Sequence, residues 1–217
     1  MPFSVTTLTH ILFLQSKNAT SMGNREQQKM GVATVSTSSS RPQIKARDAR
    51  IVCDTMVQGL GKKLRHLGVD THILESGLDH THCARVAHQE NRFIVTRGSA
   101  YTQVPEGHIC QIKSDQVDDQ IKEVFTYFNI VVSPDDFFSR CHACNSDDFI
   151  EMSNQQLMRG AHTNSGVPVQ SFNIPSLILN KHQSFDVCNT CGKCYWEGSH
   201  KKRFCEGRFA KAATSTH

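Results

Sequence analysis

The sequence predicts an α/β domain, with a parallel sheet and helices on its faces, followed by a smaller module that contains paired cysteines. Between residues 50 and 128, short apolar runs alternate with longer segments in which apolar residues recur every three to four positions. The short runs are typical of buried strands, and the longer segments are typical of amphipathic helices. Such an alternation favours a parallel sheet. After residue 137 the alternation ends and two Cys-x-x-Cys pairs appear, which indicates a separate module.

The first predicted strand is the apolar run at residues 51–53, and the carboxylate of Asp54 follows it directly. A helix is predicted next, because four apolar residues share one face at helical spacing: Met56, Leu60, Leu64 and Leu67. The opposite face of this helix carries basic residues: Lys62, Lys63, Arg65 and His66. Gly68 is expected to end the helix, because glycine readily takes the left-handed conformation after a last helical turn.

The same alternation continues through the rest of the domain. The predicted strands are residues 71–74, 92–96 and 109–112, and the predicted helices are residues 79–90 and 115–128. In the last helix the apolar residues again fall on one face: Val117, Ile121, Val124 and Phe128. Beyond residue 137, apolar segments at 149–152 and 185–187 flank the cysteine pairs and are predicted to form hairpins.

Four regions follow from these patterns. Residues 1–48 form a polar tail that buries too little apolar surface to fold, so we predict disorder, with an organelle-targeting leader as the alternative. The α/β domain covers residues 49–136, the cysteine module residues 137–205, and a basic, disordered C-terminus residues 206–217. Residues 1–50 carry seven basic and two acidic residues, so most of the net positive charge of the chain lies in the tail.

The composition favours an intracellular protein, cytoplasmic or nuclear, without membrane contact. No apolar run approaches the roughly 18 residues that span a bilayer, and the run at residues 11–14 is too short for a secretory signal. The nine cysteines are an odd number, and four of them stand at metal-ligand spacing, which is typical of a reducing compartment. Cys53, Cys83 and Cys110 lie in apolar or helical contexts and are predicted to be buried thiols.

The strongest functional signal is a cysteine pair that occurs twice at the same spacing: Cys141 with Cys144, and Cys188 with Cys191. Each pair brings two thiolates onto one turn, and two such turns complete the tetrahedral coordination of Zn²⁺. Protein ligands would fill every position, so the site is predicted to be structural and the module to be a zinc ribbon. The 43 residues between the pairs require an inserted loop. Cys194 and Cys205 are substitutes or spectators, and four unligated cysteines are the alternative reading.

Asp54 is the first candidate for a catalytic residue. A carboxylate at the carboxyl end of the first strand of a parallel sheet lies in the crevice where α/β folds bind ligands. Carboxylates clustered there hold Mg²⁺ or Mn²⁺, which activate water and stabilise charge on a phosphate. A solvated strand end or a helix N-cap is the plainer reading of a single aspartate. Asp79, which opens the next predicted helix, has the same two readings.

Four segments, in order, resemble the C-terminal RNase domain of Nibbler-type 3′–5′ exonucleases: residues 54–70 (DTMVQGLGKKLRHLGVD), 92–97 (RFIVTR), 138–145 (FSRCHACN) and 191–200 (CGKCYWEGSH). The resemblance covers about residues 48–205. It implies a PIN-like nuclease fold followed by a zinc ribbon, with acidic residues that bind divalent metal. In this family the domain occurs alone or behind a separate exonuclease domain, for which the first 50 residues of this chain are too few and too polar.

The chain departs from the family pattern at one acidic position. Where the family commonly has Thr-Arg-Asp, residues 96–98 of this chain read Thr-Arg-Gly, and losing that carboxylate is expected to weaken divalent-metal binding. Asp54 and Asp79 carry over from the pattern as catalytic acids. Two other acids are alternatives for the missing ligand: Asp115 and Asp118.

Basic residues expected near the crevice are candidates for RNA contacts: Lys62, Lys63, Arg65 and Arg97. They would follow a phosphate backbone, although a solvated helix face is the alternative. Tyr195 and Trp196 either stack on bases or pack against the ribbon core.

The sequence thus predicts a metal-dependent ribonuclease that acts on RNA ends or small-RNA precursors. The expected partners are single-stranded RNA and proteins of small-RNA processing. The alternative is a catalytically weakened RNA- or protein-binding module that retains the fold and the zinc ribbon, and Gly98 favours this alternative.

Overall fold

The computed structural model describes residues 41–99, 101, 104–105, 107–198, 203–204 and 206–207. These residues belong to one of the two compact units of the chain, Ser38–His217. The predicted N-terminal tail up to residue 40 and the C-terminal tail beyond residue 207 lie outside the described residues. Within the described part, no helix is long and apolar enough to cross a membrane.

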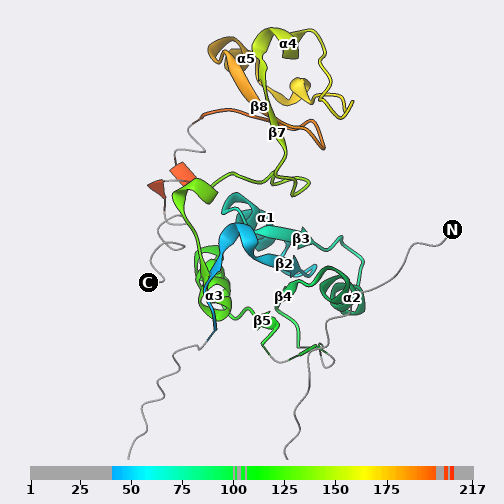
Figure 1. The fold of residues 1–217 in the computed structure, drawn as a ribbon, viewed down its shortest axis with the longest axis vertical. Coiled ribbons are helices and arrows are strands. Elements are labelled where there is room, and N and C mark those ends of the chain that lie inside the picture. Colours follow the sequence, from blue (N-terminus) through cyan, green and yellow to red (C-terminus); the bar gives the residue numbers. More distant parts are fainter. Residues whose placement is uncertain are drawn as a thin grey trace, which may run out of the picture. The chain divides into compact units, whose positions relative to one another are not determined.

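The centre of the α/β domain is a sheet of four parallel strands (Figure 1). Along the chain they are β2 (Arg50–Cys53), β3 (Asp70–Ile73), β4 (Phe93–Thr96) and β5 (Ile109–Gln111). Their order in the sheet is β3-β2-β4-β5, and every neighbouring pair is parallel. The chain first moves outward from β2 to β3 and then returns across β2 to reach β4. The direction of winding therefore reverses between β2 and β4, and this switch point is where open α/β sheets bind ligands.

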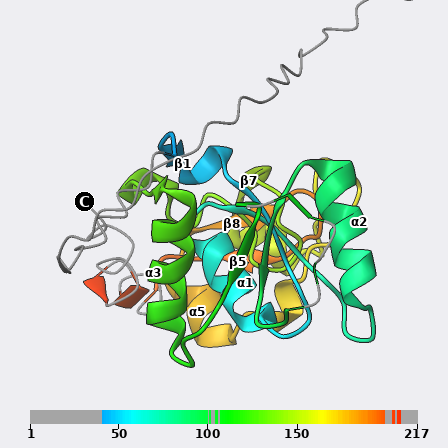
Figure 2. The ribbon, with the colours of Figure 1, turned by 90° about the horizontal axis from the view of Figure 1, so that it is seen from below.

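Alternate residues of the strands face opposite layers of helix. Ile51, Cys53 and Val95 belong to a core shared with α1 (Gln58–His66) and α3 (Val117–Phe128), whereas Val52 and Ile94 pack with α2 (His80–Glu90). Figure 2 shows α2 and α3 on opposite sides of the strands. Each large apolar side chain that is fully buried contributes about 1.5–3 kcal/mol. The predicted α/β fold, with a parallel sheet and helices on both faces, is confirmed.

The first helix begins later than its apolar pattern predicts. Met56 was expected on the buried face, but it precedes the helix and is 62% exposed. The cause is local, because the carboxylate of Asp54 accepts a hydrogen bond from the Met56 backbone N–H at 2.9 Å and forms a turn there. Gly68 ends the helix region as predicted, with a φ of 85°.

The domain also starts earlier than predicted. β1 (Ile44–Lys45) pairs in parallel with β6 (Ile130–Val131), and the short 3₁₀ helix η1 (Ala46–Asp48) places the side chain of Ala46 in the core. The described fold therefore reaches back before the predicted boundary at residue 49. Strands of two residues are too short for an alternating pattern, which is why they escape prediction.

The second module contains an antiparallel sheet of three strands, β7 (Phe149–Ser153), β8 (Ser184–Cys188) and β9 (Cys194–Tyr195). The β7–β8 pair confirms the predicted hairpin segments. The insertion between them contains α4 (Asn154–Met158), η3 (Ser171–Asn173) and α5 (Ser176–Lys181). The second module has its own hydrophobic core, to which the insertion contributes Leu157 and Ile174 and β8 contributes Phe185.

The chain between and after the modules returns to the α/β core. The 3₁₀ helix η2 (Pro134–Asp136) leads into Phe137 and Phe138, and Phe138 donates its backbone N–H to the His66 carbonyl at 2.8 Å. Phe204 is buried in the same core. Residues on both sides of the predicted boundary between 136 and 137 therefore pack in the core of the α/β domain. So does Phe204, which was predicted to belong to the cysteine module.

Candidate functional site

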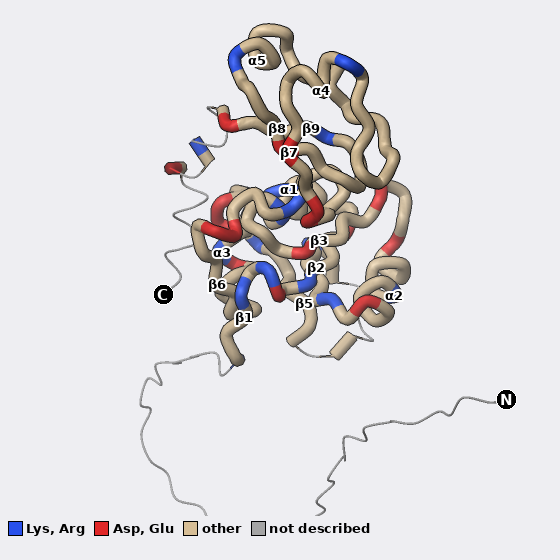
Figure 3. The backbone as a smooth tube through the Cα atoms, turned by 45° about the horizontal axis from the view of Figure 1, so that its top comes forward, with Lys and Arg blue, Asp and Glu red and all other residues tan. Residues whose placement is uncertain are grey.

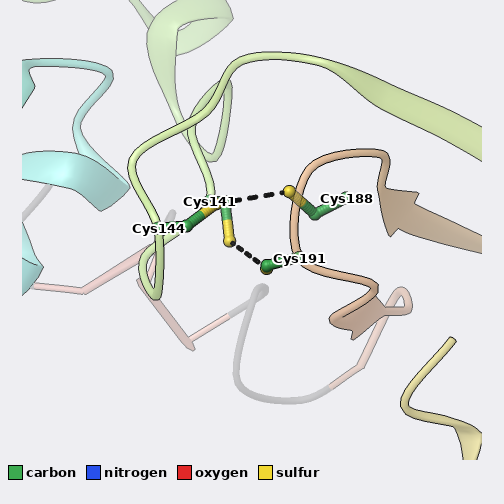
Figure 4. Close-up of side chains that lie close together, drawn as sticks. All are labelled: Cys141, Cys144, Cys188 and Cys191. Atoms are coloured by element: carbon green, nitrogen blue, oxygen red, sulfur yellow. Dashed lines mark hydrogen bonds between the residues drawn. The ribbon is translucent and has the colours of Figure 1, made fainter. Parts of the chain in front are cut away.

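Four cysteine side chains converge between two loops, and Figure 4 shows Cys141 and Cys144 from one loop facing Cys188 and Cys191 from the other. All four sulfur atoms lie within 4.8 Å of one another. The Cys141 and Cys191 sulfurs are 3.6 Å apart, and the Cys144 and Cys188 sulfurs are 3.5 Å apart. These separations exclude disulfides, whose sulfurs are bonded at about 2 Å.

The two loops have the same backbone design. In each loop, the residue after the second cysteine has a positive φ, 74° at Asn145 and 72° at Gly192. Its N–H bonds to the carbonyl of the first cysteine, at 2.8 Å to Cys141 and 2.9 Å to Cys188. At residue 192 only glycine fits, because a Cβ atom would lie 2.2 Å from the Pro168 carbonyl oxygen. We call each of these turns a knuckle.

The donor set fits a closed structural metal site. Metal–sulfur bonds of about 2.3 Å in a tetrahedron place sulfurs about 3.8 Å apart, close to the two separations given above. Four thiolates leave no position for water, which argues for a structural rather than a catalytic ion. Cys194 has its sulfur 3.7 Å from the Gly192 carbonyl and packs in the module core, so it is a spectator. Cys205 lies outside the described residues.

Hydrogen bonds prepare Cys141 to act as a ligand. Burial opposes its ionisation, but hydrogen bonds from the Cys144 N–H, the Tyr195 hydroxyl and the Ala143 N–H lower the pKa of the Cys141 thiol to about 7. The Tyr195 oxygen lies 3.0 Å from the Cys141 sulfur. Tyr195 also contacts the ring of Phe149, and Trp196 contacts that of Phe185. These contacts favour the prediction that Tyr195 and Trp196 pack against the ribbon core over the alternative that they stack on bases.

The first knuckle is joined to the α/β domain by Arg65 and Asn145. Arg65 is only 7% exposed, and its guanidinium donates to the carbonyls of Thr71, His142 and Ala143 at 2.8, 2.9 and 2.7 Å. The Asn145 side chain accepts from the Thr71 N–H at 2.9 Å. Sequence reasoning placed Arg65 beside a phosphate, but its donors are used by backbone carbonyls inside the protein.

Asn145 extends this junction to an ionic network at the start of β3. Its side-chain amide donates to Asp70 at 2.7 Å, and Arg92 donates to the same carboxylate at 2.7 Å. Burial raises the pKa of Asp70, but the hydrogen bonds from Arg92 and Asn145 outweigh burial and hold the pKa below its usual range. Since Asp70 opens β3, the knuckle lies at the amino edge of the parallel sheet.

Asp54 lies at the opposite, carboxyl edge, directly after β2 and beside the end of β4. It is 6% exposed, and its backbone N–H donates to the Val95 carbonyl at 3.1 Å. One carboxylate oxygen accepts from the Met56 N–H, and the other accepts from the Thr96 hydroxyl. The Thr96 oxygen in turn accepts from the Gly98 N–H at 2.8 Å, which directs the hydroxyl proton toward Asp54. Thr96, which sequence reasoning missed as a site residue, thus orients the carboxylate.

Replacing Thr96 by valine is expected to lower the free energy of unfolding by about 1.5–3 kcal/mol, because a hydrogen bond to a buried carboxylate is lost. Urea unfolding measures the change. Thr71→Val is the matched control, since Thr71 is equally buried and its hydroxyl donates to an uncharged carbonyl, that of Val69. Its expected cost is about 0.5–1.5 kcal/mol. Equal costs for the two variants would contradict the special role of Thr96.

The other predicted acids do not form a dense cluster with Asp54. Asp79 is exposed and caps α2, where its carboxylate accepts from the His82 N–H at 3.0 Å. Asp115 pairs with Arg97, which follows β4. Within the described residues, three or more potential ligand side chains gather only at the four cysteines. The carboxyl edge therefore presents one oriented carboxylate, and a divalent ion would find few protein ligands there.

The predicted basic residues are distributed over both edges. Figure 3 shows basic positions on α1. Lys62 is exposed, whereas Lys63 and Arg65 belong to the last turn of α1, the end that meets the knuckle. Burial lowers the pKa of His142, and the positive charges of Lys193, Lys62, Arg65 and Lys63 lower it further. Lys62, Lys63 and Arg65 were expected near the Asp54 crevice, but their charges act on His142 of the knuckle. Of the four predicted basic residues, Arg97 is the one that follows a strand at the carboxyl edge.

Comparison with known proteins assigns the chain to a family. Residues 49–207 match the Mut7-C RNAse domain. The exonuclease mut-7 homolog of Homo sapiens is 42% identical over 134 residues, which are 58% of this chain and 15% of the relative. Exonuclease mut-7 of Caenorhabditis elegans is 30% identical over 110 residues, which are 46% of this chain and 12% of the relative. The matched regions are therefore a small part of both relatives. Because the family match covers most of this chain and the predicted resemblance is to the same RNase domain, the chain belongs to the Mut7-C RNAse domain family.

Proposed function

We propose that this chain is a metal-dependent ribonuclease domain whose reaction takes place at the carboxyl edge of the parallel sheet, around Asp54. Membership of an RNase domain family supports nucleic acid as the substrate class. The observation that carries the location is the carboxylate of Asp54, which is buried at the switch point and oriented by the Met56 N–H and the Thr96 hydroxyl. A carboxylate held in this way is preorganised, so no reorientation is needed when a cation binds.

The residues at this edge have separate roles in the proposal. Asp54 would hold Mg²⁺ or Mn²⁺, and such an ion supplies an activated water and offsets the charge that develops on the phosphate. Thr96 positions Asp54 without touching the substrate. Asp79 is retained as a second candidate ligand. Arg97, half-buried and paired with Asp115, provides a positive charge beside the edge. The exposed Lys62 lies on α1 away from this edge and is retained as a candidate contact for a longer stretch of the RNA backbone.

Asp54→Asn is expected to reduce Mn²⁺-dependent cleavage of a labelled single-stranded RNA by at least about 100-fold, because the amide does not carry the charge that holds a divalent ion. Asp79→Asn separates two roles, since asparagine caps a helix about as well as aspartate does. A ligand role for Asp79 predicts lost activity in a protein of unchanged stability. Wild-type rates in Asp54→Asn would contradict the proposed site.

A second candidate function is an RNA-binding module with little turnover. The observation that favours it is Gly98, which stands where the family commonly has a carboxylate and leaves Asp54 without a third acid among the described residues. Fluorescence anisotropy and cleavage assays on the same RNA distinguish the candidates. Binding without cleavage by the wild-type protein would favour the module and contradict the enzyme.

The substrate is proposed to be the end of a single-stranded RNA, such as a small-RNA precursor, because both relatives are named exonucleases. A linear RNA and a circular RNA of the same sequence test this point, since an enzyme that requires an end degrades only the linear form. Proteins of small-RNA processing would be its partners, and a cytoplasmic or nuclear location accords with that role.

For the four-cysteine site we propose structural zinc. The support is the tetrahedral separation of the sulfurs and the shared design of the two knuckles. Metal analysis of the purified protein is expected to find about one zinc ion per chain, whereas protein without metal would contradict the assignment.

A further inference from the structure

Arg65 is a buried arginine without a carboxylate partner. Its three hydrogen bonds all go to backbone carbonyls, and no acidic side chain in the described part of the chain lies within ion-pair distance of it. A buried charge is normally paired, because its transfer out of water is costly. Burial disfavours the charged guanidinium, and the negative charges that offset this are first those of Cys141 and Cys144 and then those of Cys53 and Asp70.

The two knuckle carbonyls that accept from Arg65 belong to peptide groups whose N–H ends face a metal ligand. The His142 carbonyl shares its peptide group with the Ala143 N–H, and the Ala143 carbonyl shares its group with the Cys144 N–H. Both of these N–H groups hydrogen-bond to the Cys141 sulfur. Each peptide group therefore lies between the guanidinium and the sulfur, and hydrogen bonds arranged in series polarise one another.

We propose that Arg65 is an outer-sphere residue of the metal centre, which compensates the negative charge of the metal-bound thiolates through the two peptide groups of the first knuckle. A divalent ion with four thiolates retains two net negative charges, and a nearby fixed cation stabilises that state. The inference rests on the metal assignment proposed above for the four cysteines. It gives the α/β domain a direct part in metal binding, because Arg65 belongs to α1 and not to the ribbon.

The proposal predicts that Arg65 contributes differently to the stability of the metal-loaded protein and of the metal-free protein. With metal bound, the thiolates offset the cost of burying the guanidinium. Without the metal fewer of the four sulfurs carry a negative charge, so this compensation is smaller and Arg65 contributes less to stability. Replacing Arg65 by an apolar residue should therefore weaken metal binding, and it should destabilise the loaded protein more than the metal-free protein. A purely structural link between the two modules would affect both forms equally.

The experiment compares the full chain with Arg65→Met, which keeps much of the side-chain length, and with Arg65→Lys, which keeps the charge but loses the planar fork. Arg85→Met is the matched control, because Arg85 is an exposed arginine on α2. Zinc affinity is measured by competition with a chromophoric chelator. The melting temperature is measured with zinc and after chelation, and the sulfur-to-metal charge-transfer band is recorded after Co²⁺ substitution.

Arg65→Met is expected to lower zinc affinity by about 10- to 100-fold, the range seen when an outer-sphere partner is lost. Arg65→Lys should recover part of this loss, and Arg85→Met should match the wild type. The Co²⁺ charge-transfer band should shift in Arg65→Met, because the electron density on the Cys141 sulfur changes. If Arg65→Met does not fold, the zinc affinity and the Co²⁺ charge-transfer band of Arg65→Lys test the proposal instead.

Unchanged zinc affinity and an unchanged Co²⁺ band in a folded Arg65 variant would overturn the proposal. An equal fall in melting temperature with and without zinc would also overturn it, since that result describes a structural link only. A wild-type protein that binds neither Zn²⁺ nor Co²⁺ is a different outcome, because it removes the metal assignment itself. None of these measurements depends on nuclease activity, so failure of the ribonuclease proposal leaves the test intact.

Discussion

Gly98→Asp is expected to raise divalent-metal-dependent RNA cleavage by about 10- to 100-fold, a gain comparable to the loss when a supporting group of a metal site is removed. The substitution returns a carboxylate to the edge of the sheet where Asp54 already provides one. A Cβ atom at residue 98 would lie 3.4 Å from the Thr96 hydroxyl oxygen and 4.0 Å from the Met56 sulfur, which are ordinary contacts. The fold should therefore accept the side chain, and Mn²⁺ titrations of kcat/KM measure its effect.

Two variants at the same position show whether charge is the cause. Gly98→Asn adds nearly the same atoms without the charge, and Gly98→Ala adds only the Cβ atom. Both should retain wild-type rates. Without a divalent ion, the second carboxylate near Asp54 should lower the melting temperature by like-charge repulsion, and Mn²⁺ should reverse this effect because a bound ligand stabilises the folded state. Equal activities of Gly98→Asp and Gly98→Asn would contradict a metal-binding role for this edge.

The fold of the α/β domain could be predicted from the sequence because the patterns that indicate its strands and helices involve residues close together in the chain. The apolar run after Arg50, the face formed by Leu60 and Leu64, and the carboxylate after the first strand all depend on neighbouring residues. Parallel pairing then followed from the alternation of strands and helices, and with it the location of Asp54 at the carboxyl edge. The same locality explains the error at Met56, where a side chain to backbone hydrogen bond competed with the helix.

The contacts that define the metal site's surroundings could not be predicted in this way. Arg65 reaches carbonyls 77 and 78 residues away, and Asn145 meets Asp70 from 75 residues away. A basic residue on the polar face of a helix is usually solvated, so nothing in the pattern distinguishes Arg65 from Lys62. A local signal did exist for Asn145, because asparagine tolerates the positive φ needed after a knuckle.

Removal of metal is expected to unfold the cysteine module and also to loosen part of the α/β domain. Structural zinc contributes on the order of 10–16 kcal/mol in small zinc-binding peptides, which exceeds what the small core of β7 and β8 can replace. Sequence reasoning predicts that residues 138–200 loosen while the upstream domain survives. The structure refines this expectation, because the knuckle binds α1 through Arg65 and β3 through Asn145. Hydrogen exchange with and without chelator measures the protection of each segment.

Protection should fall throughout β7 and β8, and to a smaller extent in the last turn of α1 and at the start of β3. By contrast, α2 and β4 should remain protected, because the core that they share with Val52 includes no knuckle residue among the residues that the structure describes. Cys141→Ser should reproduce the effect of chelation, whereas Cys194→Ser, which alters a spectator thiol, should retain metal. Unchanged exchange in α1 and β3 would show that the knuckle is not coupled to the α/β domain. Loss of protection in β4 as well would show instead that the α/β domain depends on the metal for its fold.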